Sequence, residues 1–337
     1  MNHLHTARRR RIPAAQNRRA ERTSGRISPS VAHGVSLARK LSEGRALLGE
    51  YRDRARDGYE FQKLFADVAQ YEGLLRAHAG ISLQEARVFE IGFGARPHRQ
   101  LILQSMGIDA RGVDAEVPVL SGRPSEFVAM ARRNALERGA KSLVRFALFD
   151  SRERTALNQA LARHGLLPRL DPARLVVADA GALELEAGSV DLIFSEDVFE
   201  HIARDTLQAL VPKIARWLRP GGVALIRPNI YTGITGGHLL EWSRRAVRDP
   251  HRRRNSEPWE HLRRRRVEAN THLNRMTRAD YRRLFASSFV IHQELVTQPD
   301  LGRAYLDERA RAELAQWPDE ELFSNQTLFV LGRRPGG

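Results

Sequence analysis

The chain has 337 residues, a formal net charge of +15 and no cysteine, so it is long enough for one large α/β domain with extensions or for two domains. Without cysteine it has no disulfide framework, no thiolate nucleophile and no Cys-based zinc site, which is compatible with the cytoplasmic location that we expect. No apolar run reaches the roughly 18 residues of a membrane span, and the first residues lack the apolar core of a secretory signal.

The positive charge is concentrated in two arginine-rich segments, residues 8–26 and 244–266. Lysine contributes little, with only Lys40, Lys63, Lys141 and Lys213. This preference for arginine can reflect coding bias as easily as a surface for an anionic partner. The charge therefore leaves nucleic-acid binding open without favouring it.

Three regions follow from the composition along the chain. Residues 1–34 are basic and poor in apolar side chains, which predicts a disordered tail, with an amphipathic transit peptide as the alternative. Apolar residues then recur at three- and four-residue spacing over residues 35–80, which predicts two helices that cover an edge of the core or, less simply, a lid. Residues 81–337 form the main domain, with insertions at about 117–174 and 233–276.

The most informative stretch is a buried strand that runs into two glycines and then a proline. Val88 to Ile91 is the strand, Gly92 and Gly94 are spaced by one residue, and Pro97 suits the first turn of a helix. This order predicts a nucleotide-like ligand at the carboxyl end of the strand. A pyrophosphate is disfavoured, since proline stands at the third glycine position and Glu90 lies at the end of the strand. An acidic side chain instead suits the cationic S-adenosylmethionine.

The rest of the main domain alternates strands and helices, which predicts a doubly wound, Rossmann-like, mostly parallel sheet of seven strands. Besides the first strand, the predicted strands are residues 110–114, 174–180, 190–194, 223–229, 289–296 and 326–332, and the predicted helices are residues 99–106, 125–138, 155–164, 211–218, 277–285 and, in large part, 301–317. Asp114 ends the second strand about 20 residues past the glycines, where an acid can accept hydrogen bonds from ribose hydroxyls. Asp179 ends the third strand, and the fourth strand is followed by a polar turn and then by a helix that carries Glu200 and His201.

Taken together, these segments resemble the class I S-adenosylmethionine-dependent methyltransferases, and most closely the broad type that methylates small molecules. The residues that carry the resemblance are Phe89–Gly94, Gly112–Asp114, Ala178–Ala180, Asp191–Ser195, Phe199–Ile202 and Leu218–Gly222. The resemblance implies that S-adenosylmethionine is the cofactor. It further implies that Glu90, Gly92, Phe93 and Gly94 contact the methionine part, Asp114 the ribose, Asp179 and Ala180 the adenine, and Ser195 and Glu196 the methyl-transfer side.

Three histidines are candidates for a catalytic base, because their pKa values lie near neutrality. His201 follows the fourth strand, and His238 and His261 lie in the late insertion, whose mixture of glycines, histidines, tryptophans and amides predicts the acceptor-binding surface. Each of these histidines can equally be structural. No metal is predicted, since no His-x-x-x-His spacing joins the histidines to Glu196 and Asp197.

The expected reaction is methyl transfer to an oxygen or nitrogen atom of a small-molecule or glycan-like acceptor. A nucleic-acid methyltransferase is an alternative, although the Ser195–Val198 turn lacks the Asn-Pro-Pro-aromatic run with which many base-methylating enzymes hold a flipped base. A non-catalytic module with the same fold is a second alternative, and a nicotinamide dehydrogenase comes last. The sequence predicts no oligomeric state.

Overall fold

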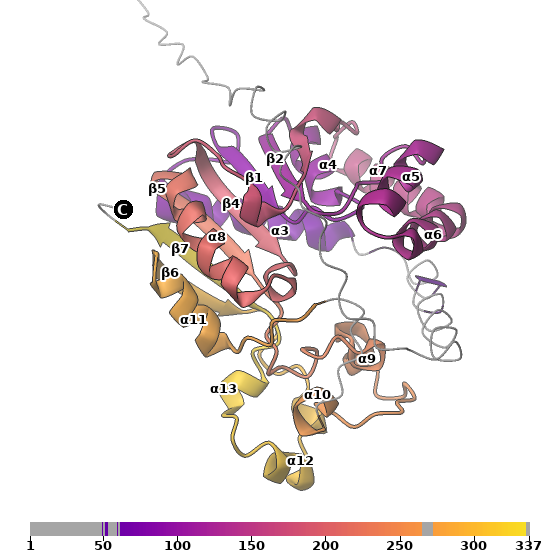
Figure 1. The fold of residues 1–337 in the computed structure, drawn as a ribbon, viewed down its shortest axis with the longest axis vertical. Coiled ribbons are helices and arrows are strands. Elements are labelled where there is room, and N and C mark those ends of the chain that lie inside the picture. The colour runs from indigo at the N-terminus through magenta and orange to yellow at the C-terminus, as the bar shows by residue number, and fades with distance from the viewer. Residues whose placement is uncertain (1–48, 50, 53–58, 60, 265–271, 335–337) are drawn as a thin grey trace, which may run out of the picture.

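The computed structural model describes residues 49, 51–52, 59, 61–264 and 272–334 (Figure 1). The predicted tail over residues 1–34 and most of the first helix expected within residues 35–80 lie outside the described residues. Among the described residues, no helix combines the length and the apolar character that a bilayer span requires.

The centre of the molecule is a seven-stranded sheet, as predicted. Its strands are β1 (Arg87–Ile91), β2 (Asp109–Asp114), β3 (Leu175–Val177), β4 (Val190–Glu196), β5 (Leu218–Arg227), β6 (Phe289–Val296) and β7 (Thr327–Arg333). They are arranged in the order β3-β2-β1-β4-β5-β7-β6, and β7 alone is antiparallel to its neighbours. The order reverses direction between β1 and β4, so the carboxyl ends of these two strands border the crevice in which ligands bind in such sheets.

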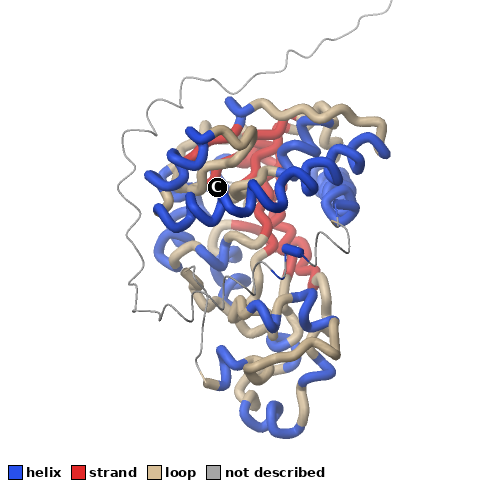
Figure 2. Tube along the Cα trace, turned by 90° about the vertical axis from the view of Figure 1, so that its right-hand side faces the viewer, coloured by secondary structure: helices blue, strands red, loops and turns tan. Residues whose placement is uncertain are grey.

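Helices cover both faces of the sheet, as Figure 2 shows with helices in blue on either side of the red strands. One face is covered by α3 (Phe61–Ala79), α4 (His98–Ser105) and α7 (Ser151–Arg163), and their apolar side chains form one core with β1, β4 and β5. The other face is covered by α8 (Arg204–Trp217) and α11 (Arg278–Ala286), which form a second core. Alternate side chains of each strand point to opposite faces, which is why the central strands are apolar on both sides.

The connection between β2 and β3 is a helical insertion. It consists of α5 (Pro124–Arg133), α6 (Leu136–Arg145), a short π-helix (Phe146–Asp150) and α7. The sequence predicted a single helix over residues 125–138, but the chain breaks at Asn134. The Asn134 side chain accepts a hydrogen bond from the Val117 amide and donates one to the Ala115 carbonyl, so it leaves the helix to hold the preceding loop.

A separate small core lies below the sheet in Figure 1. It joins the insertion after β5, with α9 (Arg244–Arg248) and α10 (Glu260–Arg263), to the segment with α12 (Glu308–Glu313) and α13 (Asp319–Leu322). The shared apolar residues include Ile234, Trp242, Trp259, Leu314 and Phe323. We call this unit the cap subdomain. The long helix predicted over residues 301–317 is reduced to a turn and α12, because Gly302 takes a positive φ of 99° and Asp307 caps a new helix.

Candidate active site

The glycine loop leaves β1 at the predicted position. Gly92 and Gly94 have φ values of 90° and 69°, which favour glycine. A Cβ atom on Gly92 would lie 2.1 Å from Cγ2 of Val198, so the turn after β4 packs directly on the loop. A Cβ atom on Gly94 would meet nothing within 4 Å, so this side of the loop is open to a ligand.

Asp114 lies at the end of β2 and contacts the same loop. Its Oδ2 atom accepts a hydrogen bond of 2.6 Å from the Gly94 amide, and its Oδ1 atom accepts one of 2.6 Å from the Glu116 amide. Burial raises the pKa of the Asp114 carboxyl, although the two amides act in the opposite direction. Each oxygen keeps a second lone pair, so the carboxylate can still accept from vicinal hydroxyls. An acid held against an open glycine loop fits the ribose of S-adenosylmethionine.

Glu90 and Phe93 are both buried beside the loop. The Oε2 atom of Glu90 accepts a hydrogen bond of 2.9 Å from Nε2 of Gln100, and burial raises the pKa of Glu90 to about 7. Phe93 lies against Gly112 in β2. A buried carboxyl whose pKa is raised gains most from a nearby cation, which fits the electrostatic role expected for Glu90 towards the cofactor.

Asp179 and Ala180 follow β3 on the side expected for the adenine. Asp179 is exposed, and its Oδ1 atom accepts a hydrogen bond of 2.8 Å from the Gly181 amide at the start of a short 3-10 helix, Ala180–Ala182. The insertion does not remove these residues from the carboxyl edge of the sheet, because β3 pairs with β2 up to Val177.

Ser195 and Glu196 end β4, where the sequence placed them on the methyl-transfer side. Ser195 donates a hydrogen bond of 2.8 Å to the Ile91 carbonyl and so ties β4 to the glycine loop. Glu196 points into the protein, where its Oε1 atom accepts from the Tyr71 hydroxyl at 2.5 Å and its Oε2 atom lies 3.2 Å from Nη1 of Arg227. Both side chains have structural partners in this conformation, and a direct contact with the cofactor stays a prediction.

Two of the three candidate histidines lie together. The rings of His201 and His238 are in edge-to-face contact with their centroids 5.0 Å apart. Burial lowers the pKa of both, to about 4 for His238. His238 has a φ of 53°, and Asp197 beside this pair has a φ of 55°, values that are costly for residues other than glycine and that cluster at functional sites.

His261 lies apart from this pair, in a different environment. It is 2% exposed, and its Nε2 atom lies 2.8 Å from the Tyr231 carbonyl, to which it donates. Burial lowers the pKa of His261 to about 4. A Cβ atom on Gly237 would lie 2.7 Å from the His261 ring, so this side chain supports the backbone next to His238 from within the cap subdomain.

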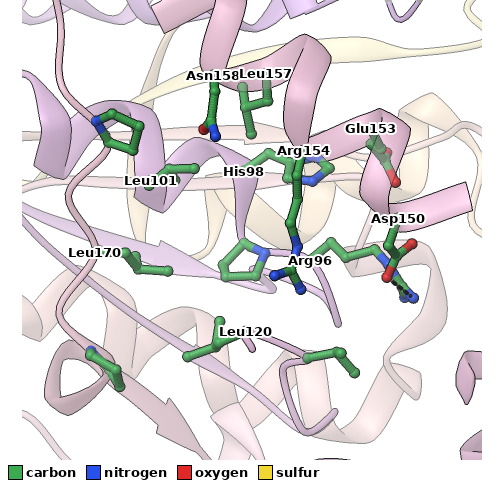
Figure 3. Close-up of a pocket in the computed structure, with 14 residues that line it drawn as sticks. Arg96, His98, Leu101, Leu120, Asp150, Glu153, Arg154, Leu157, Asn158 and Leu170 are labelled. Carbon is green, nitrogen blue, oxygen red and sulfur yellow. Dashed lines mark hydrogen bonds and ion pairs between the residues drawn. The ribbon is translucent and has the colours of Figure 1, made fainter. Parts of the chain in front are cut away.

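A cavity of about 330 Å³ lies behind the glycine loop (Figure 3). Arg96, Leu101, Leu120, Arg154 and Leu170 are among its lining residues, and Arg96 is paired there with Asp150 at 2.8 Å. None of the residues that the sequence assigned to the cofactor or to catalysis lines it. The cavity therefore belongs to the contact between α4 and the helical insertion.

Several arginines of the second basic segment have partners within the protein. Arg244 pairs with Asp197 at 2.8 Å, and Arg263 pairs with Glu313 at 2.6 Å. Arg254 lies over the rings of Trp242 and Tyr305, 4.8 Å from each centroid. These contacts hold the cap subdomain together, so part of the charge that suggested an anionic partner is structural.

Glu200 is a further polar residue at this edge of the sheet, and it was not among the site residues predicted from the sequence. Glu200 and His201 lie in a 3-10 turn, Phe199–His201, immediately after β4, whereas His238 follows β5. One ligand-capable atom of each of the three side chains lies within 4.8 Å of those of the others. The adjacent pair Glu200-His201 was the only signal in the sequence, because β5 and its following loop bring in His238 from 37 residues away.

One family model matches part of the chain. Residues 127–226, from α5 to the end of β5, match a family described as a methyltransferase domain. The match covers 100 of the 337 residues, and together with the seven-stranded fold and its glycine loop it indicates an enzyme with a methyltransferase domain of the class I type. Its cofactor is S-adenosylmethionine.

Among solved structures, similar folds come from several organisms. A protein of Pyrococcus horikoshii is 14% identical over 82% of this chain and 92% of its own, with a TM-score of 0.42. A TehB-like S-adenosylmethionine-dependent methyltransferase of Corynebacterium glutamicum is 12% identical over 87% and 100%, with a TM-score of 0.39. Geranyl diphosphate C-methyltransferase of Streptomyces coelicolor is 15% identical over 79% and 77%, with a TM-score of 0.41. No curated protein matches the sequence.

Proposed function

We propose that this methyltransferase acts on an oxygen or nitrogen atom of a small-molecule or glycan-like acceptor. The observation that carries the proposal is the meeting of the turn after β4 with the loop after β5. There the neutral pair His201 and His238 lies at the carboxyl edge of the sheet, beside the cap subdomain. Polar groups at that edge, next to the glycine loop, are where an acceptor reaches the cofactor in doubly wound sheets.

The cofactor-binding residues are proposed on the same geometry. Asp114 accepts from the ribose hydroxyls, and Gly94 leaves the space for the methionine part beside Glu90. Asp179 and Ala180 border the adenine, and Ser195 holds the glycine loop on β4 through the Ile91 carbonyl. These residues bind and orient the cofactor, and positioning supplies most of the rate enhancement of a displacement reaction.

In the reaction, S-adenosylmethionine supplies a methyl group whose bond to sulfur breaks with its electron pair remaining on sulfur. The acceptor atom forms the new bond to carbon and gives up its proton. His201 or His238 can take that proton, because burial lowers the pKa of both and leaves them neutral at physiological pH. His261 is proposed to act only through the backbone that it supports near His238.

Cofactor binding tests the assignment of Asp114. We expect saturable binding of S-adenosylmethionine by calorimetry and a loss of at least about tenfold in Asp114→Ala, which corresponds to about 1.4 kcal/mol. Asp109→Ala is the matched control, since Asp109 lies at the opposite end of β2 and pairs with Arg174. Equal affinities in both variants would remove the ribose assignment. A mass-spectrometric search of cell extract for products that gain a labelled methyl group would then identify the acceptor.

A nucleic-acid acceptor is the second candidate, since the net charge of +15 leaves an anionic partner possible. Phosphate contacts make such binding steeply dependent on salt. RNA affinity that falls strongly between low and physiological salt, and that survives deletion of residues 1–34, would support it. RNA affinity that disappears with those residues would assign the charge to the tail alone.

A further inference from the structure

The carboxyl group of Glu200 is a buried acid without a partner. Glu200 is 4% exposed, and neither of its oxygens has a hydrogen-bond partner among the described residues. A buried acid without a partner is costly unless a cation or a donor arrives to pair with it.

His201 presents a free nitrogen to this acid. Its Nδ1 atom lies 2.9 Å from the His272 carbonyl, which can only accept, so Nδ1 carries the proton and Nε2 keeps its lone pair. Nε2 lies 4.0 Å from Oε1 of Glu200. A backbone carbonyl that fixes one imidazole nitrogen while the other is left free is the usual support of a metal-binding histidine.

His238 completes a set of three ligands. The set spans at most 4.8 Å, whereas ligands about 2.1 Å from a shared cation lie roughly 3.4 Å apart, so binding requires the side chains to approach by about 1 Å. The Nε2 atom of His238 accepts from Nδ2 of Asn229 at 3.3 Å, a contact that orients the ring and that is exchanged for the cation when Nε2 binds it. The His201 side chain is 31% exposed, so one side of the set is open to a further ligand.

Asp197 lies beside the set but is already engaged. It pairs with Arg244 at 2.8 Å and accepts from Gln326 at 2.6 Å, so we do not count it among the ligands. The positive φ values of Asp197 and His238 show that the backbone is held in a costly conformation on both sides of the set.

We propose that Glu200, His201 and His238 bind one divalent cation of the zinc type, with an open coordination position for the acceptor. Two imidazoles and one carboxylate match the ligand set of catalytic zinc sites, whereas Mg²⁺ prefers oxygen ligands alone. Binding of the cation does not depend on the proposed function, but its catalytic role does. In that role the acceptor hydroxyl binds to the cation, its pKa falls, and its proton leaves to solvent. His201 and His238 then act as ligands and not as the base.

Metal binding can be measured on the full chain after treatment with EDTA. We expect one equivalent of Zn²⁺ by calorimetry, Co²⁺ absorption bands that Zn²⁺ abolishes, and no competition from a hundredfold excess of Mg²⁺. Glu200→Gln, His201→Ala and His238→Ala should each weaken Zn²⁺ at least tenfold. His251→Ala, at an exposed histidine of the cap subdomain, is the control for adventitious binding and should leave the affinity unchanged.

Folding and cofactor binding separate the possible outcomes. Glu200→Gln is nearly isosteric and removes only the ionisable group, so its thermal melting should show a folded protein even if an alanine variant fails to fold. Zn²⁺ bound equally by the wild type, Glu200→Gln and His238→Ala would overturn the site, as would no binding by the wild type. S-adenosylmethionine binding is measured in the same EDTA-treated protein, where we expect it to persist. Its absence alongside intact Zn²⁺ binding would count against the proposed function and leave the metal site standing.

Discussion

The two glycines of the loop after β1 need glycine for different reasons. Gly92 has a φ of 90°, and a Cβ atom there would lie 2.1 Å from Val198, whereas Gly94 has a φ of 69° and open space around it. We therefore expect Gly92→Ala to lower the free energy of unfolding by about 2 to 4 kcal/mol, from overlap and strain together. Gly94→Ala should cost about 1 kcal/mol, from the backbone conformation alone.

The same pair of variants tests the cofactor assignment. Gly94→Ala places a methyl group in the open space, so it should reduce S-adenosylmethionine affinity more than it reduces stability. Urea unfolding and calorimetry on both variants supply the two quantities. A Gly94→Ala protein with wild-type affinity would show that the cofactor does not approach this part of the loop.

Glu90 makes stability depend on pH in a direction opposite to that of most carboxyl groups. Its folded-state pKa is about 7 against an ordinary value of 4.5, because the side chain is buried. As the pH rises through this window the unfolded chain loses the proton first, so the free energy of unfolding falls between about pH 4.5 and 7, by roughly 3 kcal/mol. Glu90→Gln should remove that slope and be the more stable protein at pH 8. Chemical denaturation of the wild type and of Glu90→Gln from about pH 4.5 to 8 measures this difference. Parallel curves of the free energy of unfolding against pH would contradict the prediction.

At the scale of single elements, the sequence predicted the boundaries of helices and strands best where one local pattern dominated. β6 was predicted over the residues at which it lies, 289–296, and α4 within one residue, because apolar periodicity and flanking turns agree there. α8 was predicted to begin at Val211 but begins at Arg204, since Pro212 is tolerated inside a helix whose apolar face is buried against the sheet. Packing by residues distant in the sequence decided this boundary, and the local pattern does not contain that information.

The capping of α11 is an element-scale feature that is visible in the sequence and present in the structure. The Thr277 hydroxyl accepts a hydrogen bond of 3.0 Å from the Asp280 amide, and the Asp280 carboxylate accepts one of 3.0 Å from the Thr277 amide. Thr277→Ala should lower the free energy of unfolding by about 1 kcal/mol, because the orphan amides lose their acceptor. Thr277→Ser keeps the hydroxyl and should stay close to wild type. A comparable loss of stability in both variants, measured by thermal unfolding, would assign the effect to packing of the methyl group.

At the scale of the whole molecule, the positions of the glycine loop, Asp114 and Asp179 were predictable, whereas the meeting of Glu200 with His238 was not. The glycine loop, Asp114 and Asp179 follow strands whose order in the chain is also their order at the sheet edge, so local motifs locate them. Glu200 and His238 meet only because β4 pairs with β5, and the cap subdomain is assembled from residues 233–264 and 301–323. A set of ligands built across such a fold has no fixed spacing in the sequence.

The N-terminal helix α3 is tied to the strands of the site by a buried charge network. Arg227 at the end of β5 is 2% exposed, and its Nη1 atom lies 2.9 Å from Oδ1 of Asp67 in α3 and 3.2 Å from Glu196 in β4. The Tyr71 hydroxyl of α3 donates to the same Glu196. The guanidinium lowers the pKa of Asp67 together with Lys63, against the effect of burial. Helix α3 and strands β4 and β5 therefore share one set of charges.

Removing the cation of this network should cost far more than removing a surface charge. Arg227→Met removes the nearest guanidinium from two buried carboxylates and leaves them with Arg99, which lies 3.3 Å from Asp67 and 4.0 Å from Glu196. We expect the free energy of unfolding to fall by about 3 kcal/mol. Lys141→Met, which breaks an exposed pair with Glu137 in α6, is the control and should change little. The triple variant Arg227→Met, Asp67→Asn and Glu196→Gln also neutralises both acids, and it should recover part of the lost stability in urea unfolding, since Arg99 then loses both carboxylates. A triple variant as unstable as the single one would mean that Arg227 acts through its packing and not through its charge.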